Sequence, residues 1–195
     1  MLTGKKIVLG VSGGIAAYKM ANVASMLSKL HADIHVVMTE NATHFITPET
    51  FEVLTGNHCY TDTFDRCMEL HVPHIALGTQ ADAILIAPAS ADVVGKIANG
   101  IADDMLTTCV LPATCPVMLA PSMNVHMYEN PIVQDNMKKL VSYGYEIIEA
   151  DEGYLACRDI GKGKLPPEHV LVDYIIRACA MDKDLAGKKV LVTAG

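Results

Sequence analysis

The chain has 195 residues, of which 51% are hydrophobic, and its formal net charge is -7 at pH 7. This length fits one domain of ordinary size with a substantial core. Contacts with phosphate backbones require a surplus of lysine and arginine, so the acidic balance argues against nucleic acid as a partner.

The composition also limits where the protein acts and how it assembles. No uninterrupted apolar segment reaches the roughly 18 residues that a membrane span requires, and the N-terminus leads into Lys5 and Lys6 rather than a secretion signal. We therefore expect a cytoplasmic protein without a membrane partner. The six cysteines lack C-x-x-C spacing, which favours free thiols over a disulfide framework or a metal site. The high apolar content predicts a homo-oligomer.

Strand-like and helix-like segments alternate along the chain. Residues 6–11 form an apolar run that ends in glycines, and an apolar stripe at helical spacing follows at Val23, Met26, Leu27 and Leu30. Further strands are expected at residues 33–38, 83–87, 116–120 and 146–149, and helices over 91–106, 131–143 and 169–180. This alternation predicts an α/β fold with a single doubly wound, mostly parallel sheet and helices on both faces, either flavodoxin-like or Rossmann-like.

The last third of the chain contains two irregular regions. Residues 153–168 are rich in glycine and proline, which predicts a loop or flap. Residues 187–195 repeat the pattern of residues 4–11, a strand that leads into a glycine turn. We interpret residues 1–181 as one domain, and residues 182–195 as a linker with the first strand of a second α/β domain in a longer parent protein.

The glycine-rich turn at residues 10–14 (GVSGG) is the first candidate site. It matches the G-x-S-x-G pattern of hydrolases, but it follows the first strand, whereas the hydrolase motif lies deep in the sheet. The dinucleotide pattern G-x-G-x-x-G is absent, although Glu40 follows the second strand as a ribose-binding acid would. Two interpretations remain. Either the turn simply needs glycine, or its N–H groups and the Ser12 hydroxyl hold a phosphate at a helix N-terminus.

Small and polar side chains follow two later strands. Residues 87–92 (APASAD) place small side chains where a flat ring fits against the backbone, although such residues also serve close packing. Asn124 lies just beyond the strand expected at residues 116–120. Ligands of open α/β sheets bind outside the carboxyl ends of the strands, so Asn124 is a candidate binding residue.

Three further patterns are weaker. His71 and His74 lack a third metal ligand in register, which is more typical of surface or helix-start histidines. Residues 161–164 (GKGK) lack the spacing of a phosphate-binding Walker loop. Cys157 is a thiol beside Arg158 on the expected flap, although most cysteines are buried and inert.

Five motifs together resemble the flavin-containing cysteine decarboxylases in order and approximate spacing. They are residues 12–19 (SGGIAAYK), 73–75 (PHI), 87–91 (APASA), 121–128 (PSMNVHMY) and 156–163 (ACRDIGKG). The likeness covers residues 4–181 and is greatest to the phosphopantothenoylcysteine decarboxylase half of bacterial bifunctional coenzyme A biosynthesis proteins. It implies that residues after Gly187 begin a fused phosphopantothenate-cysteine ligase domain. The chain departs from the family at Asp92 and Val93, where Asn and Thr are usual, and at Tyr128, which is often Trp.

The resemblance implies an FMN-dependent carboxy-lyase. Its substrate would be 4'-phospho-N-pantothenoylcysteine and its product 4'-phosphopantetheine, formed through a thioaldehyde and an aminoenethiol. By this resemblance, Asn124 orients the substrate carboxylate, His74 serves acid–base or charge stabilisation, and Cys157 donates the last proton. The implied flavin contacts are Ser12, Gly13, Gly14, Thr39, Phe45, Ser90, Ala91 and Ser122.

The resemblance also implies a homotrimer, or a multiple of it up to a dodecamer, with the flavin near a subunit boundary. Two other functions remain open at this stage. Flavin prenyltransferases share the fold and FMN but do not use the pair of Asn124 and Cys157. A non-catalytic flavoprotein subunit would keep the flavin pocket and typically lose His74, Asn124 or Cys157, all of which are present.

Overall fold

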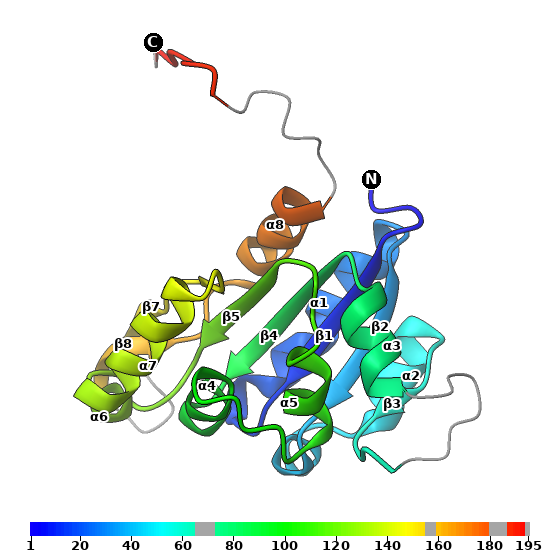
Figure 1. The fold of residues 1–195 in the computed structure, drawn as a ribbon, viewed down its shortest axis with the longest axis horizontal. Coiled ribbons are helices and arrows are strands. Elements are labelled where there is room, and N and C mark those ends of the chain that lie inside the picture. The colour runs from blue at the N-terminus through cyan, green and yellow to red at the C-terminus, as the bar shows by residue number, and fades with distance from the viewer. Residues whose placement is uncertain (65–72, 155–158, 180–186, 194–195) are drawn as a thin grey trace.

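A computed structural model describes residues 1–64, 73–154, 159–179 and 187–193. Six parallel strands form the central sheet in the spatial order β3-β2-β1-β4-β5-β6 (Figure 1). They are β1 (Lys6–Val11), β2 (Asp33–Met38), β3 (Cys59–Tyr60), β4 (Ala83–Ala89), β5 (Val117–Pro121) and β6 (Glu146–Ile147). This is the Rossmann order of a doubly wound sheet, so the predicted fold class is confirmed.

The two central strands explain why the sequence pattern is so clear there. All seven residues of β4 and the last five of β1 are buried, since helices cover both faces of the sheet. A strand buried on both sides reads as a continuous apolar run rather than an alternating one. Ile7 of β1 lies in register with Ile34 of β2 on one side and with Ala83 of β4 on the other.

Helices form a layer on each face of this sheet (Figure 1). One apolar core joins the sheet to α1 (Lys19–Lys29), α2 (Pro48–Thr55) and α8 (Glu168–Cys179). The other joins it to α3 (Pro73–Gln80), α4 (Ala91–Ala98), α5 (Met105–Val110) and α7 (Pro131–Ser142). Shorter helices follow three strands: η1 (Ile15–Tyr18) after β1, η2 (Glu40–His44) after β2 and α6 (Val125–Tyr128) after β5.

The structure differs from the sequence-based expectation in three places. The helix expected over residues 91–106 is two helices, because Gly100 follows α4 with a φ of 68° and Asp104 caps α5 through its side chain. The strand β3 has only two residues and was not predicted. The expected loop at 153–168 instead contains the end of β7 (Asp151–Tyr154) and all of β8 (Ile160–Lys164), which pair as an antiparallel hairpin. Pairing between strands supplies the backbone hydrogen bonds there, which a glycine-rich sequence does not indicate.

Residues 187–193 are exposed and form neither helix nor strand. A segment forms a β-strand only when it pairs with a neighbouring strand, and no described strand pairs with this one. The strand expected there, and the division at residue 181, therefore stay predictions. Within the described ranges, no helix has both the length and the apolar character needed to cross a bilayer.

Two helical glycines provide a test of how closely the helices pack. Gly78 lies in α3, and a Cβ added to it would stand 2.3 Å from the carbonyl oxygen of Cys109 in α5. Gly95 lies in α4, and its added Cβ would meet nothing closer than the Asn136 amide nitrogen at 3.7 Å. The same substitution should therefore have opposite effects at the two positions.

We expect Gly78→Ala to lower the free energy of unfolding by about 1–3 kcal/mol, because the clash outweighs the better helix propensity of alanine. Gly95→Ala should raise the free energy of unfolding by up to about 1 kcal/mol, since only the propensity gain applies. Urea denaturation followed by circular dichroism measures both. Equal stabilisation by the two variants would contradict the close contact between α3 and α5.

Candidate functional site

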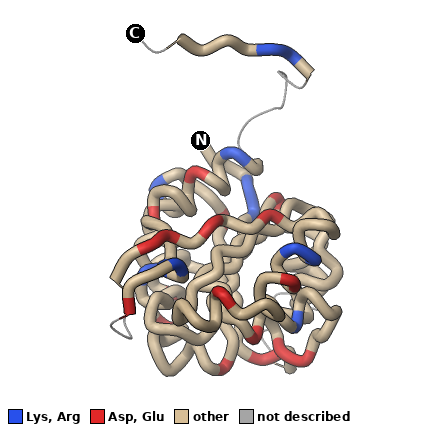
Figure 2. The backbone as a smooth tube through the Cα atoms, turned by 90° about the vertical axis from the view of Figure 1, so that its left-hand side faces the viewer, with Lys and Arg blue, Asp and Glu red and all other residues tan. Residues whose placement is uncertain are grey.

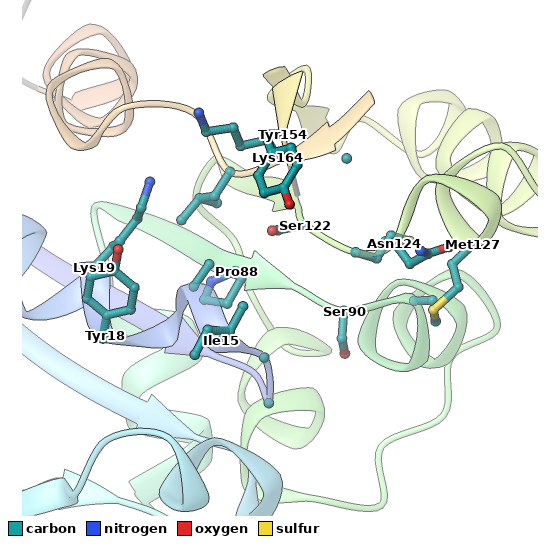
Figure 3. A pocket seen from close by; sticks show the side chains of 17 residues that line it. Ile15, Tyr18, Lys19, Pro88, Ser90, Ser122, Asn124, Met127, Tyr154 and Lys164 are labelled. Atoms are coloured by element: carbon teal, nitrogen blue, oxygen red, sulfur yellow. The ribbon is translucent and has the colours of Figure 1, made fainter. Parts of the chain in front are cut away.

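A cavity of about 440 Å³ opens at the carboxyl edge of the sheet, where β1 and β4 lie side by side (Figure 3). The chain leaves β1 toward the face of α1 and leaves β4 toward the face of α4, and this divergence opens a crevice between them. The glycine turn with η1, the ends of β4 and β5, and the β7–β8 hairpin supply the walls. Its size is in the ordinary range for small-molecule sites.

Ser12 is fully buried and links the ends of the two central strands. Its hydroxyl donates to the carbonyl oxygen of Pro88 at 2.7 Å and accepts from the N–H of Ser90 at 2.9 Å. The Ser12 N–H also donates to the Pro88 carbonyl. A hydroxyl has a single proton, and the Pro88 carbonyl accepts it here, so the Ser12 hydroxyl has no second proton to donate to a phosphate. A flavin contact through another atom of Ser12 stays a prediction.

The two glycines that follow have different surroundings. A Cβ on Gly13 would lie 2.5 Å from the Cβ of Asn41, so close packing alone explains this glycine. A Cβ on Gly14 would meet no heavy atom within 4 Å, and Gly14 lines the cavity. The turn therefore combines both interpretations left open by the sequence, with a packing role at Gly13 and free space for a ligand beside Gly14.

Thr39 carries an unsatisfied polar group beside this turn. Its N–H donates to the Val11 carbonyl at the end of β1, and the residue is only 8% exposed. The Thr39 hydroxyl oxygen is buried and has no hydrogen-bond partner in the described part of the chain. A buried hydroxyl without a partner costs free energy, which a hydrogen bond to a ligand would recover.

The departures from the family pattern at Asp92 and Val93 lie in the first turn of α4. The Ser90 hydroxyl caps this helix by accepting from the N–H of Val93, whose side chain is buried. The Asp92 carboxylate lies 3.3 Å from the ammonium group of Lys96, which also contacts Asp103 and Asp104. The hydrogen bond to Asp103 and the other two carboxylates raise the pKa of Lys96. The extra negative charge at Asp92 is thus compensated within the protein, away from the cavity lining.

Asn124 lies at the opening of α6 and lines the cavity. Its side-chain oxygen accepts from the N–H of His126, and its amide nitrogen donates to the carboxylate of Asp159, both at 2.9 Å. The cap fixes the orientation of the amide, so its nitrogen is the group available to an anion. A substrate carboxylate binding here would share or replace the contact with Asp159.

The β7–β8 hairpin approaches this loop through two glycines. The carbonyl of Gly163 accepts from the N–H of Met123 at 3.0 Å, and a Cβ on Gly163 would lie 2.4 Å from the Met123 oxygen. A Cβ on Gly161 would lie 2.6 Å from a methyl carbon of Val125. Side chains at these positions would push the hairpin away, so the glycines allow β8 to form a wall of the cavity.

The single chain brings together only part of the expected site. The cavity lining contains Asn124 and five of the expected flavin contacts, namely Gly13, Gly14, Ser90, Ala91 and Ser122. Thr39 and Phe45 lie outside the lining, on the segment after β2. His74 lies in the first turn of α3, on the face of the sheet that α4 also covers but outside the cavity lining, and its Nδ1 atom is buried without a described partner. Cys157 lies outside the described residues, so its role stays a prediction.

The structure adds lining residues that the sequence did not single out, notably Tyr18, Lys19, Tyr154 and Lys164 (Figure 3). Lys19 stands in the first recognised motif, but nothing in its spacing separates it from an ordinary surface lysine. Lys164 reaches the cavity because residues 160–164 pair with residues 151–154 instead of forming the expected loop.

The four cysteines in the described part of the chain are free thiols. Burial raises the pKa of Cys59 and that of Cys109 to about 12. Both thiols therefore stay protonated and enclosed in the core, which gives them packing roles.

Comparisons with known proteins agree with this architecture. The model of the Flavoprotein family matches residues 1–180. The coenzyme A biosynthesis bifunctional protein CoaBC of Bacillus subtilis (strain 168) is 47% identical over 197 residues, a match that covers 100% of this chain and 48% of that protein. The CoaBC protein of Haemophilus influenzae is 40% identical over 194 residues, with the same coverage. The chain thus spans about half the length of the curated relatives it matches.

Two solved structures are similar over nearly their whole length. A cysteine-to-serine variant of PPC decarboxylase, complexed with pantothenoylaminoethenethiol, superposes with a TM-score of 0.79 at 29% identity, covering 88% of this chain and 96% of that one. The FMN-dependent cysteine decarboxylase SpaF gives a TM-score of 0.74 at 34% identity, covering 90% and 99%. Since the family model spans nearly all residues, the chain belongs to the Flavoprotein family.

Proposed function

We propose that the chain binds FMN and decarboxylates 4'-phospho-N-pantothenoylcysteine to 4'-phosphopantetheine in coenzyme A biosynthesis. The observation that carries the proposal is Asn124, whose amide is fixed in the cavity at the switch point of a flavoprotein fold. The match to CoaBC proteins, which covers all of this chain and 48% of the Bacillus subtilis protein, and the similarity to PPC decarboxylase support the substrate. Bound FMN would supply the electron acceptor and donor for the cysteine side chain.

The residues present fit a flavin nucleotide. The unpaired hydroxyl of Thr39 offers a hydrogen bond to a phosphate or ribityl oxygen. Gly14 leaves open space above the backbone, and the small side chains of Ser90 and Ala91 let a flat ring lie close to the chain. These features are typical of a site for an anionic group joined to a planar ring.

Asn124 would act on the carboxylate that leaves as carbon dioxide. Loss of carbon dioxide needs an adjacent group that accepts the electron pair, and a thioaldehyde formed from the cysteine side chain would provide it. We propose that the Asn124 amide nitrogen holds the carboxylate in line with this acceptor. The product of that step is an aminoenethiol, which needs a hydride, to be returned by the cofactor, and a proton before its release as phosphopantetheine. Cys157 is our proposed donor, because a thiol is a much stronger acid than a serine hydroxyl.

His74 is not part of the cavity of a single chain, so a catalytic role requires that subunits share sites. The cavity rim exposes Ile15 (59%), Tyr18 (55%) and Met127 (49%), an apolar border of the kind that a neighbouring copy covers. We propose a homotrimer, or a multiple of it, in which His74 serves a cavity beside a neighbouring copy and acts as acid, base or charge stabiliser.

Incubation of the purified protein and FMN with phosphopantothenoylcysteine tests the function directly. We expect the substrate to lose the mass of carbon dioxide and yield phosphopantetheine, as read by mass spectrometry. Cys157→Ser should instead release an aminoenethiol that is lighter than phosphopantetheine by a pair of hydrogen atoms. Recovery of unchanged substrate with the wild-type protein would refute the proposed function. Normal phosphopantetheine from Cys157→Ser would remove Cys157 from the mechanism.

Replacing Thr39 by Val tests the fit to FMN. The change removes an unpaired buried hydroxyl at nearly constant shape, so the apoprotein should unfold at the same or a higher temperature. FMN should bind roughly tenfold more weakly, because a hydrogen bond to a charged group contributes about 1.5 kcal/mol.

Thr43→Val is the matched control. The Thr43 hydroxyl donates to the Glu40 carbonyl on the exposed side of η2, so its loss should leave FMN affinity unchanged. Fluorescence titration with FMN measures both variants. Unaltered affinity in Thr39→Val would show that the orphan hydroxyl does not contact the cofactor.

A matched pair of helix caps tests Asn124. Asn130 caps α7 as Asn124 caps α6, with its side-chain oxygen accepting from the N–H two residues ahead. Asp also caps helices well, so Asn→Asp preserves both caps. At position 124, however, the new aspartate places a negative charge beside Asp159 and the substrate carboxylate. We expect Asn124→Asp to reduce the decarboxylation rate by at least about a hundredfold with FMN still bound, because like charges in contact cost several kcal/mol.

Asn130→Asp should keep the wild-type rate. Flavin content and single-turnover decarboxylation are the two measurements. A near-normal rate in Asn124→Asp would exclude the proposed contact with the carboxylate.

A further inference from the structure

Asp159 joins the β7–β8 hairpin to the side chain that the proposed function assigns to the substrate carboxylate. It immediately precedes β8, and its Oδ2 atom accepts from the amide nitrogen of Asn124 at 2.9 Å in a partly buried contact. The amide oxygen of Asn124 accepts from the N–H of His126, also at 2.9 Å. The amide therefore cannot rotate in the cavity without losing two hydrogen bonds.

The same nitrogen of Asn124 would serve both Asp159 and the substrate. An amide nitrogen has two N–H donors that diverge in one plane. Asp159 accepts from this nitrogen at 2.9 Å, and a substrate carboxylate in the proposed position would accept from the same nitrogen. Two oxygen atoms held in this way, each at hydrogen-bond distance, stand about 5 Å apart. Two carboxylates would thus face each other across a single amide group.

We propose that Asp159 is a positioning residue for decarboxylation, which holds a negative charge against the carboxylate that leaves. The inference rests on the proposed function and adds a driving force to it. Both carboxylates are anions at neutral pH, so their repulsion raises the free energy of the bound substrate, while the Asn124 amide keeps that substrate in place. Cleavage of the bond from Cα to the carboxylate carbon sends the electron pair to the thioaldehyde and releases neutral carbon dioxide. The repulsion ends with this step, so it accelerates the cleavage.

The fold can resist this repulsion because other contacts hold β8 in place. The carbonyl of Gly163 accepts from the N–H of Met123 at 3.0 Å. A Cβ on Gly161 would lie 2.6 Å from a methyl carbon of Val125, so the two chains are already in close contact there. These contacts fix the start of the strand that Asp159 precedes. Asp159 therefore stays near the amide when a second carboxylate arrives.

The proposed effect is local, and the chain offers a control for the loss of charge as such. Asp and Glu number 22 against 15 Lys and Arg, and Figure 2 shows both signs spread over the side of the backbone in view. Asp151→Asn removes one negative charge from the same hairpin. Asp151 begins β7, is exposed and lies outside the cavity lining, so solvent and salt screen its charge.

The test measures binding and bond cleavage separately, in the full chain loaded with FMN. Calorimetry gives the affinity for phosphopantothenoylserine, in which a hydroxyl replaces the reacting thiol, and for phosphopantetheine, which has no carboxylate. Asp159→Asn keeps an oxygen that accepts from the Asn124 amide but removes the charge. We expect it to bind the serine analogue about tenfold more tightly, and to bind phosphopantetheine as the wild type does.

The rate of cleavage should change in the direction opposite to the affinity. In a single turnover with saturating phosphopantothenoylcysteine, Asp159→Asn should release carbon dioxide about tenfold more slowly than the wild type. Tighter binding together with a slower reaction indicates that strain in the bound substrate has been removed. Asp151→Asn should match the wild type in both affinities and in the rate.

Each other outcome has a distinct meaning. Weaker binding of both ligands by Asp159→Asn would give Asp159 a purely structural role and overturn the inference. Unchanged affinity for the serine analogue would show that the substrate carboxylate displaces Asp159 instead of facing it, which also overturns the inference. A wild type that releases no carbon dioxide would refute the proposed function itself. An active wild type beside an Asp159→Asn variant of equal affinity and rate would refute the inference alone.

Discussion

The cavity depends on how the ends of β1 and β4 are held together, and the buried side chain of Ser12 does this. The ladder between β4 and β5 shifts register between Ile86 and Ala89, and Pro88 has no N–H to contribute. There the Ser12 hydroxyl accepts from the Ser90 N–H, and the hydroxyl and the N–H of Ser12 both donate to the Pro88 carbonyl. The strands thus stay together up to the point where the chain diverges to opposite faces. The position of every cavity residue on η1 and α4 follows from this link.

A second constraint acts from the hairpin side. Gly161 and Gly163 let β8 approach the loop after β5 to a distance that a side chain would not allow. That approach places Asp159 against the amide of Asn124 and Lys164 at the other end of the cavity. The close contact at these two glycines, which have no side chains, therefore determines the position of both ends of the site. It also couples them, because moving the hairpin would displace the carboxylate partner and the cation together.

The sequence predicts the parts of the fold whose signal is local. Strands such as β1 and β4 are buried on both faces, so their apolar runs stand out, and the bounds expected for β1 and β2 are the observed ones. The two-residue β3 has too little length to carry a pattern. The β7–β8 hairpin contains only one residue with high strand propensity on each strand, Tyr154 and Ile160, among glycines and charged residues. Its stability comes from pairing and from docking against Met123, neither of which has a local sequence signature.

The residues of the site likewise divide into those with a local sequence signal and those without one. Asn124 and Gly14 were predictable because a strand end in a parallel sheet fixes where the next residues lie. The hydrogen bond made by the Ser12 hydroxyl was not predictable, because the sequence shows a serine in a glycine turn but not the carbonyl that accepts the hydroxyl proton. Lys19 and Lys164 were not predictable from the sequence for a related reason. Lys19 and Lys164 become informative only when the fold brings them to one cavity, and this is a property of the folded chain alone.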